Sequence, residues 1–446
     1  MTECSTQLTL LDHPEKRIDV DFSAPQISSD GGLLLLRQAE IVTRICEKLA
    51  SLLPDERDRS KVVHSRIEQI MQRVFMIACG YEDCNDADSL RHDPLFKTVC
   101  DSTPRDENGL SCQSTLSRLE NLVDPRTVVA IQRLFEDEYV ASLPNDTDVV
   151  ILDIDSTADE THGNQQLSFF HGYHDHHIYH PLFIFDDEGR LVSFRLRAGN
   201  THDSRLARPM IERVIRKIKA RFPDCQVLVR ADSGFCVPRL VFGLERLHEE
   251  IGGVEYILGI ARNQVLERTA AEAMAFAKEL SDASGRRAQV FTDFYYAAGT
   301  WDEELWVVAK SEYSRKGPNP RFVLSSLTEF PGRLVYKSYC ARGECENRIK
   351  DFKNALACDR LSCSGYVANA FRLCLHAAAY RLMTAVRDRA AEVSPDLGRR
   401  QFDTLRLKLL KVGAMISESV RRIRVRLPRS YPLAEVFAAM LQPAPT

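Results

Sequence analysis

Acidic residues at the ends of strand-like segments are the first candidates for chemistry. Asp153 and Asp155 close the run VVILDID, and Asp232 closes VLVRAD, which Gly234 follows as a turn residue. Because side chains alternate across a strand, Asp153 and Asp155 lie on one face. Carboxylate oxygens are ligands of hard divalent ions such as Mg²⁺. A single acid at a strand end most often only faces water, but acids ending two neighbouring strands indicate a shared site.

The stretch YCARGECENRIKDFK, residues 339–353, contributes a third acid, Glu346. At about 100° per residue, a helix would gather four polar residues into a stripe about 60° wide. These residues are Tyr339, Arg342, Glu346 and Lys353. A solvated helix would scatter them or pair Glu with Lys at four-residue spacing. The stripe therefore predicts a charged face that holds a doubly charged group, although Gly343 could delay helix entry and break the phase.

The segments around these acids alternate between strand-like and helical patterns. Residues 149–154 are followed by two strand-like pieces joined by an Asp-Glu-Gly turn, and then by a helix with one apolar side. A strand, a helix and a further strand complete the series by residue 261. Three consecutive strands followed by alternation are what a ribonuclease H-like mixed sheet requires. We therefore predict an α/β protein with this core.

The rest of the chain suggests further domains, because 446 residues are too many for one compact core. Residues 1–145 show the three- and four-residue apolar spacing of helices, and 262–333 resemble a β-rich insertion in the core. The predicted domains are a helical N-terminal domain for end binding or dimerisation (1–145), the first part of the core (146–261), the β-rich insertion (262–333), the core segment with the Glu346 helix (334–390) and a basic C-terminal segment (391–446).

Charge is distributed unevenly along the chain. The whole protein has a formal net charge of −4, which argues against a uniformly basic coat. Residues 381–430 nevertheless hold thirteen Lys or Arg against five Asp or Glu. Such asymmetry suggests contact with a polyanion, although many basic stretches are only solvated faces. No apolar run approaches the roughly 18 residues of a membrane span, and the thirteen cysteines form no C-x-x-C pair, so we expect a soluble cytoplasmic protein with reduced thiols.

The spacing of the stripe carries a family resemblance. From Tyr339 to Lys353, the chain has a Tyr, an Arg after two intervening residues, a Glu after three more and a Lys after six more. This pattern resembles the signature around the catalytic glutamate of bacterial insertion-sequence transposases of the DDE type. The stretches LDIDST, LRADSGF, FFHGYHDHHIYHPLFIF and GYEDCNDADSLRHDP, together with the tail from LRLKLLKVGAMISESV onward, resemble the group of such elements numbered 1380. The similarity extends over most of the chain.

The resemblance implies a role for each of these residues. Asp155, Asp232 and Glu346 would be the three catalytic, metal-binding carboxylates, with Asp153 as the alternative first acid. Asp155 is favoured because Thr157 completes the family pattern. Two Mg²⁺ ions, for which Mn²⁺ would substitute, would stabilise the charge that develops during phosphodiester attack. Tyr339, Arg342 and Lys353 would contact the phosphate backbone of DNA.

The implied activity is cut-and-paste transposition in a bacterial cytoplasm. The protein would bind the terminal inverted repeats of its element, cleave there and join the freed 3′-OH ends to target DNA. Its partner is double-stranded DNA, and the pairing of two ends implies a homodimer on DNA. Two alternatives stay open, namely a catalytically inactive, domesticated DNA-binding protein and a ribonuclease H-fold nuclease without strand transfer.

Three other groups of residues are weaker candidates. Arginines in the basic tail alternate with apolar residues, which predicts a strand with one DNA-binding face; these are Arg421, Arg422 and Arg424, with Arg426 continuing the pattern. Trp301, at a turn in the insertion, could stack on a base flipped out of a hairpin intermediate, whereas Trp306 is expected in the core. The histidine-rich run at 171–180 is more simply a polar strand edge than a zinc site.

Overall fold

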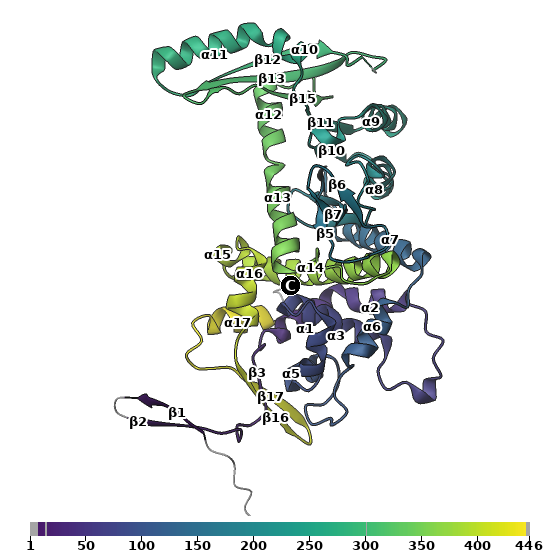
Figure 1. The fold of residues 1–446 in the computed structure, drawn as a ribbon, viewed down its shortest axis with the longest axis vertical. Helices are drawn as coiled ribbons and strands as arrows, with labels where there is room; N and C mark the ends of the chain where they lie inside the picture. The colour runs from purple at the N-terminus through teal and green to yellow at the C-terminus, as the bar shows by residue number, and fades with distance from the viewer. Residues whose placement is uncertain (1–7, 14–15, 300, 443–446) are drawn as a thin grey trace, which may run out of the picture. The chain divides into compact units, whose positions relative to one another are not determined.

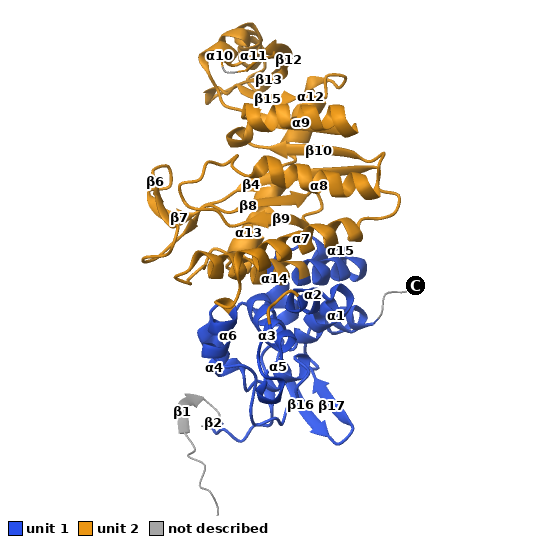
Figure 2. Ribbon diagram, turned by 90° about the vertical axis from the view of Figure 1, so that its right-hand side faces the viewer, with its two compact units in different colours: residues 1–51, 55–119, 382–446 blue, residues 52–54, 120–381 orange. Residues whose placement is uncertain are grey.

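The computed structural model describes residues 8–13, 16–299 and 301–442. The described chain forms two compact units (Figure 2). Unit 1 comprises the described residues of 1–51, 55–119 and 382–446, and unit 2 comprises 52–54 and 120–381. The finer division of the chain into five domains stays a prediction. Within the described ranges, no helix has the length and apolar character that crossing a membrane requires.

Unit 1 is mainly helical and includes a small sheet. Its helices are α1 (Leu33–Thr43), α2 (Ile45–Ser51), η1 (Arg59–Lys61), α3 (Arg66–Cys79), η2 (Cys84–Asp86), α4 (Ala87–Leu90), α5 (Pro94–Val99), α6 (Gln113–Glu120), α15 (Pro395–Gly398), α16 (Phe402–Leu405), η5 (Arg406–Leu410) and α17 (Ala434–Leu441). Strands β1 (Leu8–His13) and β2 (Lys16–Val20) pair with each other, while β3 (Ile27–Ser28), β16 (Ala414–Ser419) and β17 (Arg422–Arg426) form an antiparallel sheet. Ser65 caps the first turn of α3, and Gly80 follows its last residue in the left-handed conformation.

Unit 2 contains a large mixed sheet, as the sequence predicts. Its strands lie in the order β12-β13-β15-β11-β10-β4-β8-β9, with β14 paired to β13. Their bounds are β4 (Val149–Ser156), β8 (Leu182–Asp186), β9 (Leu191–Arg195), β10 (Gln226–Ala231), β11 (Val254–Ile260), β12 (Ala288–Tyr296), β13 (Leu305–Ser314), β14 (Gly317–Pro318) and β15 (Arg321–Ser325). Strand β4 is parallel to β10 and antiparallel to β8, and β10 is parallel to β11. The central strand β4 is therefore flanked by strands of both directions.

Residues 262–333 continue this sheet on its β11 side. Strand β15 pairs antiparallel with β11, and β13 connects β15 to β12. Helices α10 (Gln264–Thr269) and α11 (Ala271–Ser284) precede these strands. Trp306 is buried in β13, as expected, and its indole N–H donates to Asp293 of β12. A separate small sheet, β5-β7-β6 (Asp159–Glu160, His176–Tyr179, Phe169–His171), lies between β4 and β8 in the chain.

The two faces of the sheet are covered by different helices (Figure 1). Leu152 and Ile154 of β4 and Val229 of β10 pack in one apolar cluster with α8 (Ala207–Arg221) and α9 (Pro238–Ile251). Because side chains alternate along a strand, the odd-numbered residues of β4 point to the opposite face. Asp153 and Asp155 therefore lie on the side of the sheet where α12 (Gly332–Cys340) and α13 (Gly343–Lys350) pack.

Apolar contacts hold the α12–α13 segment against the sheet at both of its ends. Val335 of α12 is buried in a cluster with Ile257 of β11 and Val308 of β13. At the other end, Phe352 lies in the π-helical turn η4 (Asp351–Ala355), with its ring centroid 5.3 Å from that of Phe183 in β8 and 5.2 Å from that of Tyr380 in α14 (Tyr366–Val393). These two anchors fix the polar residues that lie between them.

We expect Leu152→Ala to destabilise unit 2 by about 2–5 kcal/mol, because Leu152 is fully buried in the central strand and its truncation leaves a cavity. Val149, at the start of the same strand, is 58% exposed, so Val149→Ala serves as a matched control and should change stability by no more than about 0.5 kcal/mol. Urea unfolding followed by tryptophan fluorescence measures both values. Equal effects of the two substitutions would contradict the burial of β4.

Candidate active site

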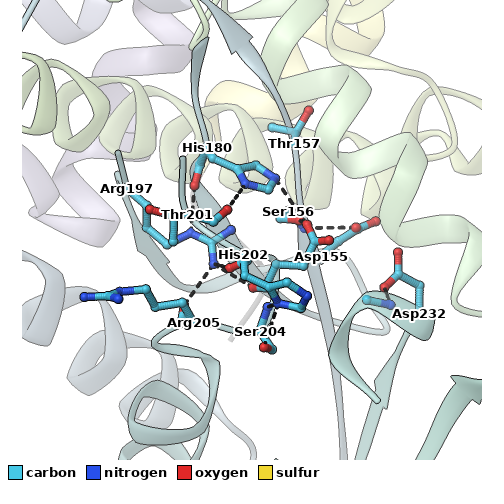
Figure 3. Close-up of polar contacts among 12 residues, drawn as sticks. Asp155, Ser156, Thr157, His180, Arg197, Thr201, His202, Ser204, Arg205 and Asp232 are labelled. Atoms are coloured by element: carbon cyan, nitrogen blue, oxygen red, sulfur yellow. Dashed lines mark hydrogen bonds and ion pairs between the residues drawn. The ribbon is translucent and has the colours of Figure 1, made fainter. Parts of the chain in front are cut away.

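The carboxyl ends of β4 and β10 bring two of the candidate acids into one region (Figure 3). Asp155 lies near the end of β4, and Asp232 follows β10 directly as the cap of the turn η3 (Ser233–Phe235). Glu346, on α13, is close enough to both for its charge to raise the pKa of Asp155 and of Asp232. Three acids that are distant in sequence are therefore neighbours in the fold.

Burial sets the electrostatics of these acids. Loss of solvent raises the pKa of Asp155 to about 7, Arg342 opposes this change, and the charges of Asp232 and Glu346 add to it. The pKa of Asp232 is also raised, again chiefly by burial and against the effect of Arg342. A carboxylate whose charged form is disfavoured by both burial and like charges gains stability from any cation placed beside it.

Arg342 is the cation that the protein itself places among the acids. Its Nη1 atom donates to Asp155 Oδ2 at 3.3 Å, and its Nη2 atom is 4.0 Å from Glu346 Oε1. The Arg342 side chain is only 12% exposed, whereas that of Glu346 is 58% exposed. Burial lowers the pKa of Arg342, but the nearby acids outweigh this effect and the net shift is upward, so Arg342 remains charged.

Asp153 has a different partner from Asp155. Its two carboxylate oxygens accept hydrogen bonds from Nε and Nη2 of Arg230, both at 2.7 Å. Arg230 is the residue directly opposite Asp153 on β10, and its Nη1 atom donates to the carbonyl of Ser338 in α12. The side chains of both members of the pair are at most 3% exposed. The Arg230 guanidinium thus balances the charge of the Asp153 carboxylate within the sheet.

The other residues of the predicted stripe differ in their surroundings. The Tyr339 ring lies against Arg342, with 5.8 Å between the guanidinium carbon and the ring centroid. The Tyr339 hydroxyl approaches the backbone at Gly259 so closely that a Cβ there would be 2.5 Å from it. Burial raises the pKa of Tyr339. Gly343 is the first residue of α13, and the two residues between α12 and α13, Ala341 and Arg342, keep right-handed helical dihedral angles, so the stripe is preserved.

Lys353 lies in the π-helical turn η4, beyond the end of α13. Its ammonium donates to Thr157 Oγ1 at 3.3 Å and to the carbonyl of Ala158 at 2.5 Å, directly after β4. It is also 3.4 Å from Oδ1 of Asp159, a fully buried acid whose pKa burial raises to about 7, against the effect of Lys353. The predicted stripe therefore contacts the end of β4 at both Arg342 and Lys353.

A divalent ion matches this set of donors in chemistry. Asp155, Asp232 and Glu346 offer only carboxylate oxygens, which are the ligands that Mg²⁺ and Mn²⁺ take. Among the described residues, no group of three or more His, Cys, Asp or Glu side chains is arranged to hold an ion as it stands. Arg342, which contacts two of the three acids, supplies the compensating positive charge.

Three residues beside the acids are missing from the sequence prediction. Asp203, on the loop between β9 and α8, contacts Ser156 and His180, and Figure 3 shows these two beside Asp155. No periodicity marks Asp203, because it lies in an irregular loop. In the sequence, His180 is only one of several histidines in the run at 171–180, and Ser156 is only one residue of the stretch LDIDST. Proximity in the fold is the signal that identifies them.

Two groups of candidate residues belong to other elements than the acids do. Arg421, Arg422 and Arg424 are exposed on the β16–β17 hairpin of unit 1. Trp301 is partly buried, with its ring centroid 5.8 Å from that of Tyr296 at the end of β12.

Comparison with known families identifies the chain. The model of the family described as Transposase DDE domain group 1 matches residues 12–445, which is nearly the whole sequence. The protein belongs to this transposase family. Among solved structures, the chain is similar to the piggyBac transposase in a synaptic complex with hairpin DNA, at 13% identity and a TM-score of 0.41, over 87% of this chain and 82% of that one. No curated protein matches this transposase.

Replacing each acid of β4 by asparagine should affect the stability of the protein differently. Asp153→Asn would leave the charge of Arg230 buried without its partner, so we expect the free energy of unfolding to fall by about 3–5 kcal/mol. Asp155→Asn is the matched control. The native pKa of Asp155, about 7, lies above its ordinary 3.8, so this group favours folding less as the pH rises through that window. At pH 8 without divalent ions, Asp155→Asn should therefore leave the unfolding midpoint unchanged or raise it.

Urea unfolding at pH 8 in EDTA compares the two variants of the transposase. If Asp155→Asn proved the more destabilising of the two, the assignment of Asp153 to a structural ion pair would be wrong.

Proposed function

We propose that this transposase binds the ends of its own DNA element, cleaves phosphodiester bonds there and joins the freed 3′-OH ends to target DNA. The observation that carries the proposal is the meeting of Asp155, Asp232 and Glu346 around the guanidinium of Arg342. Buried like charges are costly to maintain and occur where function requires them. Membership of the DDE transposase family supports the same reading.

The pattern of strands supports a ribonuclease H-like core for this activity. Strands β9, β8 and β4 are consecutive antiparallel neighbours, and β10 and β11 follow in parallel on the other side of β4. Helices α8 and α9 connect β9 to β10 and β10 to β11. This is the order of elements that the sequence predicts for such a core, and it brings the ends of β4 and β10 side by side.

Within this proposal Asp155, rather than Asp153, is the first acid. Burial raises the pKa of both acids, but Asp153 has both oxygens engaged by Arg230 at 2.7 Å, whereas Asp155 has a single, longer contact of 3.3 Å with Arg342. Asp155, Asp232 and Glu346 would hold two Mg²⁺ or Mn²⁺ ions. When bound, such ions supply Lewis acidity and charge neutralisation to phosphodiester chemistry.

The remaining residues of the stripe would bind the DNA backbone. The Arg342 fork can exchange a carboxylate partner for phosphate oxygens, which it matches in geometry. Tyr339 stacks beside Arg342 and limits its orientations. Lys353 is proposed as a point-charge contact to phosphate near Thr157, the residue that its ammonium already approaches. These three side chains would orient the scissile phosphate relative to the acids.

The β16–β17 hairpin is the proposed DNA-binding element of unit 1. Arg422, Arg424 and Arg426 alternate along β17 and are exposed, and no carboxylate lies within ion-pair distance of them among the described residues. Their cross-strand neighbours on β16 are Ser419, Ser417 and Met415, none of which carries charge. An arginine row without acidic neighbours favours a polyanion. Arg421 adds to this charge in the hairpin turn.

The proposed partners follow from the reaction. Terminal inverted repeats and target DNA are both double-stranded, and bringing two ends together implies a homodimer on DNA. Trp301 remains the proposed residue for stacking on a flipped base, should the reaction pass through a hairpin intermediate.

The central test removes one acid and measures binding and chemistry separately. In Mg²⁺, Asp155→Asn should abolish cleavage of duplexes that carry the DNA flanking the gene, because the ions lose a ligand. Binding of the same duplexes in EDTA should stay within about twofold of the parent protein. Surviving cleavage would contradict the proposed site.

A second assay supplies pre-cut ends and a plasmid target to the parent protein. A transposase yields joined product, whereas a nuclease only cleaves. Absence of both cleaved and joined product would indicate a protein that only binds DNA.

The salt dependence of DNA binding tests whether the β16–β17 hairpin contacts DNA. The double substitution Arg422→Ala and Arg424→Ala should reduce the slope of log affinity against log salt by about 1.8, since each lost phosphate contact removes about 0.9. The control pair Arg216→Ala and Arg400→Ala removes two exposed arginines that are already paired, with Glu250 and Asp396 respectively. Fluorescence anisotropy over a salt series gives the slopes. Equal slopes for both double variants would exclude the hairpin from DNA contact.

A further inference from the structure

The loop between β9 and α8 is ordered by a buried arginine. Arg197, 2% exposed, donates from Nε to the carbonyl of His180 and from Nη1 to the carbonyls of His202, Asp203 and Arg205. These bonds fix the backbone on both sides of Asp203, as Figure 3 shows for the labelled neighbours. The position of the Asp203 carboxylate is therefore set by the fold rather than by solvent.

One oxygen of Asp203 is bound to the end of β4. Asp203 Oδ1 accepts a hydrogen bond of 2.5 Å from the hydroxyl of Ser156, the residue after Asp155. The same oxygen is 3.2 Å from Nε2 of His180, whose Nδ1 donates to the carbonyl of Thr201 at 2.8 Å. The contact with His180 is the largest cause of a lowered pKa for Asp203. This carboxylate is thus ionised, in contrast to the raised pKa values of Asp155 and Asp232.

The other oxygen of Asp203 faces the turn that carries Asp232. A Cβ placed on Gly234 would lie 2.7 Å from Asp203 Oδ2, so only a glycine allows this approach. The backbone N–H of Gly234 in turn donates to Asp232 Oδ1 at 2.9 Å. Asp203 therefore touches the residue that holds the second acid as well as the residue next to the first.

The sheet itself does not fix the separation of these two acids. The register of β4 and β10 ends at the pair Ile154 and Ala231, one residue before Asp155 and Asp232. Beyond that pair, β4 remains joined to β8 on its other side, and no ladder joins it to the η3 turn. Asp155 and Asp232 repel each other, as the effect of Asp232 on the pKa of Asp155 indicates. A connection beyond the last pair of the ladder would therefore restrict their separation further.

We propose that Asp203 is a positioning residue for the active site. Asp203 contacts Ser156 at the end of β4 and Gly234 in the η3 turn, and so sets the separation of Asp155 and Asp232. The inference rests on the proposed function, because its purpose is to present these two acids to divalent ions. Asp203 acts through Ser156 and Gly234, and His180 lies against the same oxygen that Ser156 contacts.

The first test measures Mn²⁺ binding by isothermal titration calorimetry on the full chain without DNA. Asp203→Ala should weaken Mn²⁺ affinity by about 10–100-fold, the usual effect of removing a group that orients metal ligands. Asp203→Asn keeps an oxygen that can accept from Ser156, so its loss should be smaller. Thermal unfolding in EDTA shows whether each variant is folded. If Asp203→Ala does not fold, Ser156→Ala, which removes a single hydroxyl, should still weaken Mn²⁺ binding.

The second test approaches the same contact from the opposite side. Gly234→Ala keeps all the acids but adds a methyl group against Asp203, and should also weaken Mn²⁺ binding. Gly299→Ala is the matched control, because a Cβ at Gly299 would meet nothing within 4 Å, and it should bind Mn²⁺ as the parent protein does. In cleavage assays, raised Mg²⁺ should restore the rate of Asp203→Ala but not that of Asp155→Asn.

The outcomes separate the two proposals. If Asp155→Asn loses Mn²⁺ binding while Asp203→Ala and Gly234→Ala stay within twofold of the parent protein, the positioning role is wrong and the proposed function stands. If the parent protein itself binds no Mn²⁺ and cleaves no DNA, the proposed function fails, and the positioning role fails with it.

Discussion

The contact of Arg342 with the acids at the end of the sheet is the interaction on which the rest of this structure depends. Asp155, Asp232 and Glu346 are near enough to disfavour one another's ionisation, and burial adds to that effect for the first two. One guanidinium, itself largely buried, contacts Asp155 and Glu346 and lowers the pKa of both buried aspartates. A cluster of this kind costs stability, so its persistence is best explained by a function that needs concentrated negative charge.

The surrounding fold can be understood as the support that this cluster requires. The α12–α13 segment is anchored by Val335 near one end and by Phe352 beyond the other, which keeps Arg342 over the sheet. Asp153 and Arg230 form a buried, fully hydrogen-bonded pair that adds no net charge to the same face. Just after β4, Lys353 lies 3.4 Å from the buried Asp159, an ion pair without a hydrogen bond to the carboxylate. Each of these two buried acids thus has a cation beside it.

The two units carry different parts of the proposed reaction. Unit 2 contains the acids, with their restricted geometry and altered pKa values, which suit chemistry on a phosphodiester. Unit 1 carries the exposed arginine row of β17, which lacks acidic neighbours and suits contact with a DNA backbone regardless of its sequence. Catalysis needs rigid placement of a few groups, whereas backbone binding needs many accessible charges, so the two tasks favour different elements.

The sequence by itself determined the parts of this protein that depend on local periodicity. The strands that end in Asp155 and Asp232, the charged stripe from Tyr339 to Lys353 and the mixed character of the sheet follow from alternation and helical spacing. Only the tertiary structure distinguished the surroundings of Asp153 from those of Asp155, because the difference is the presence of Arg230 on a neighbouring strand. It alone brought Asp203 from an irregular loop to Ser156 and Gly234. Charge pairing and loop position depend on contacts between residues distant in the chain, and no short stretch of sequence contains both partners.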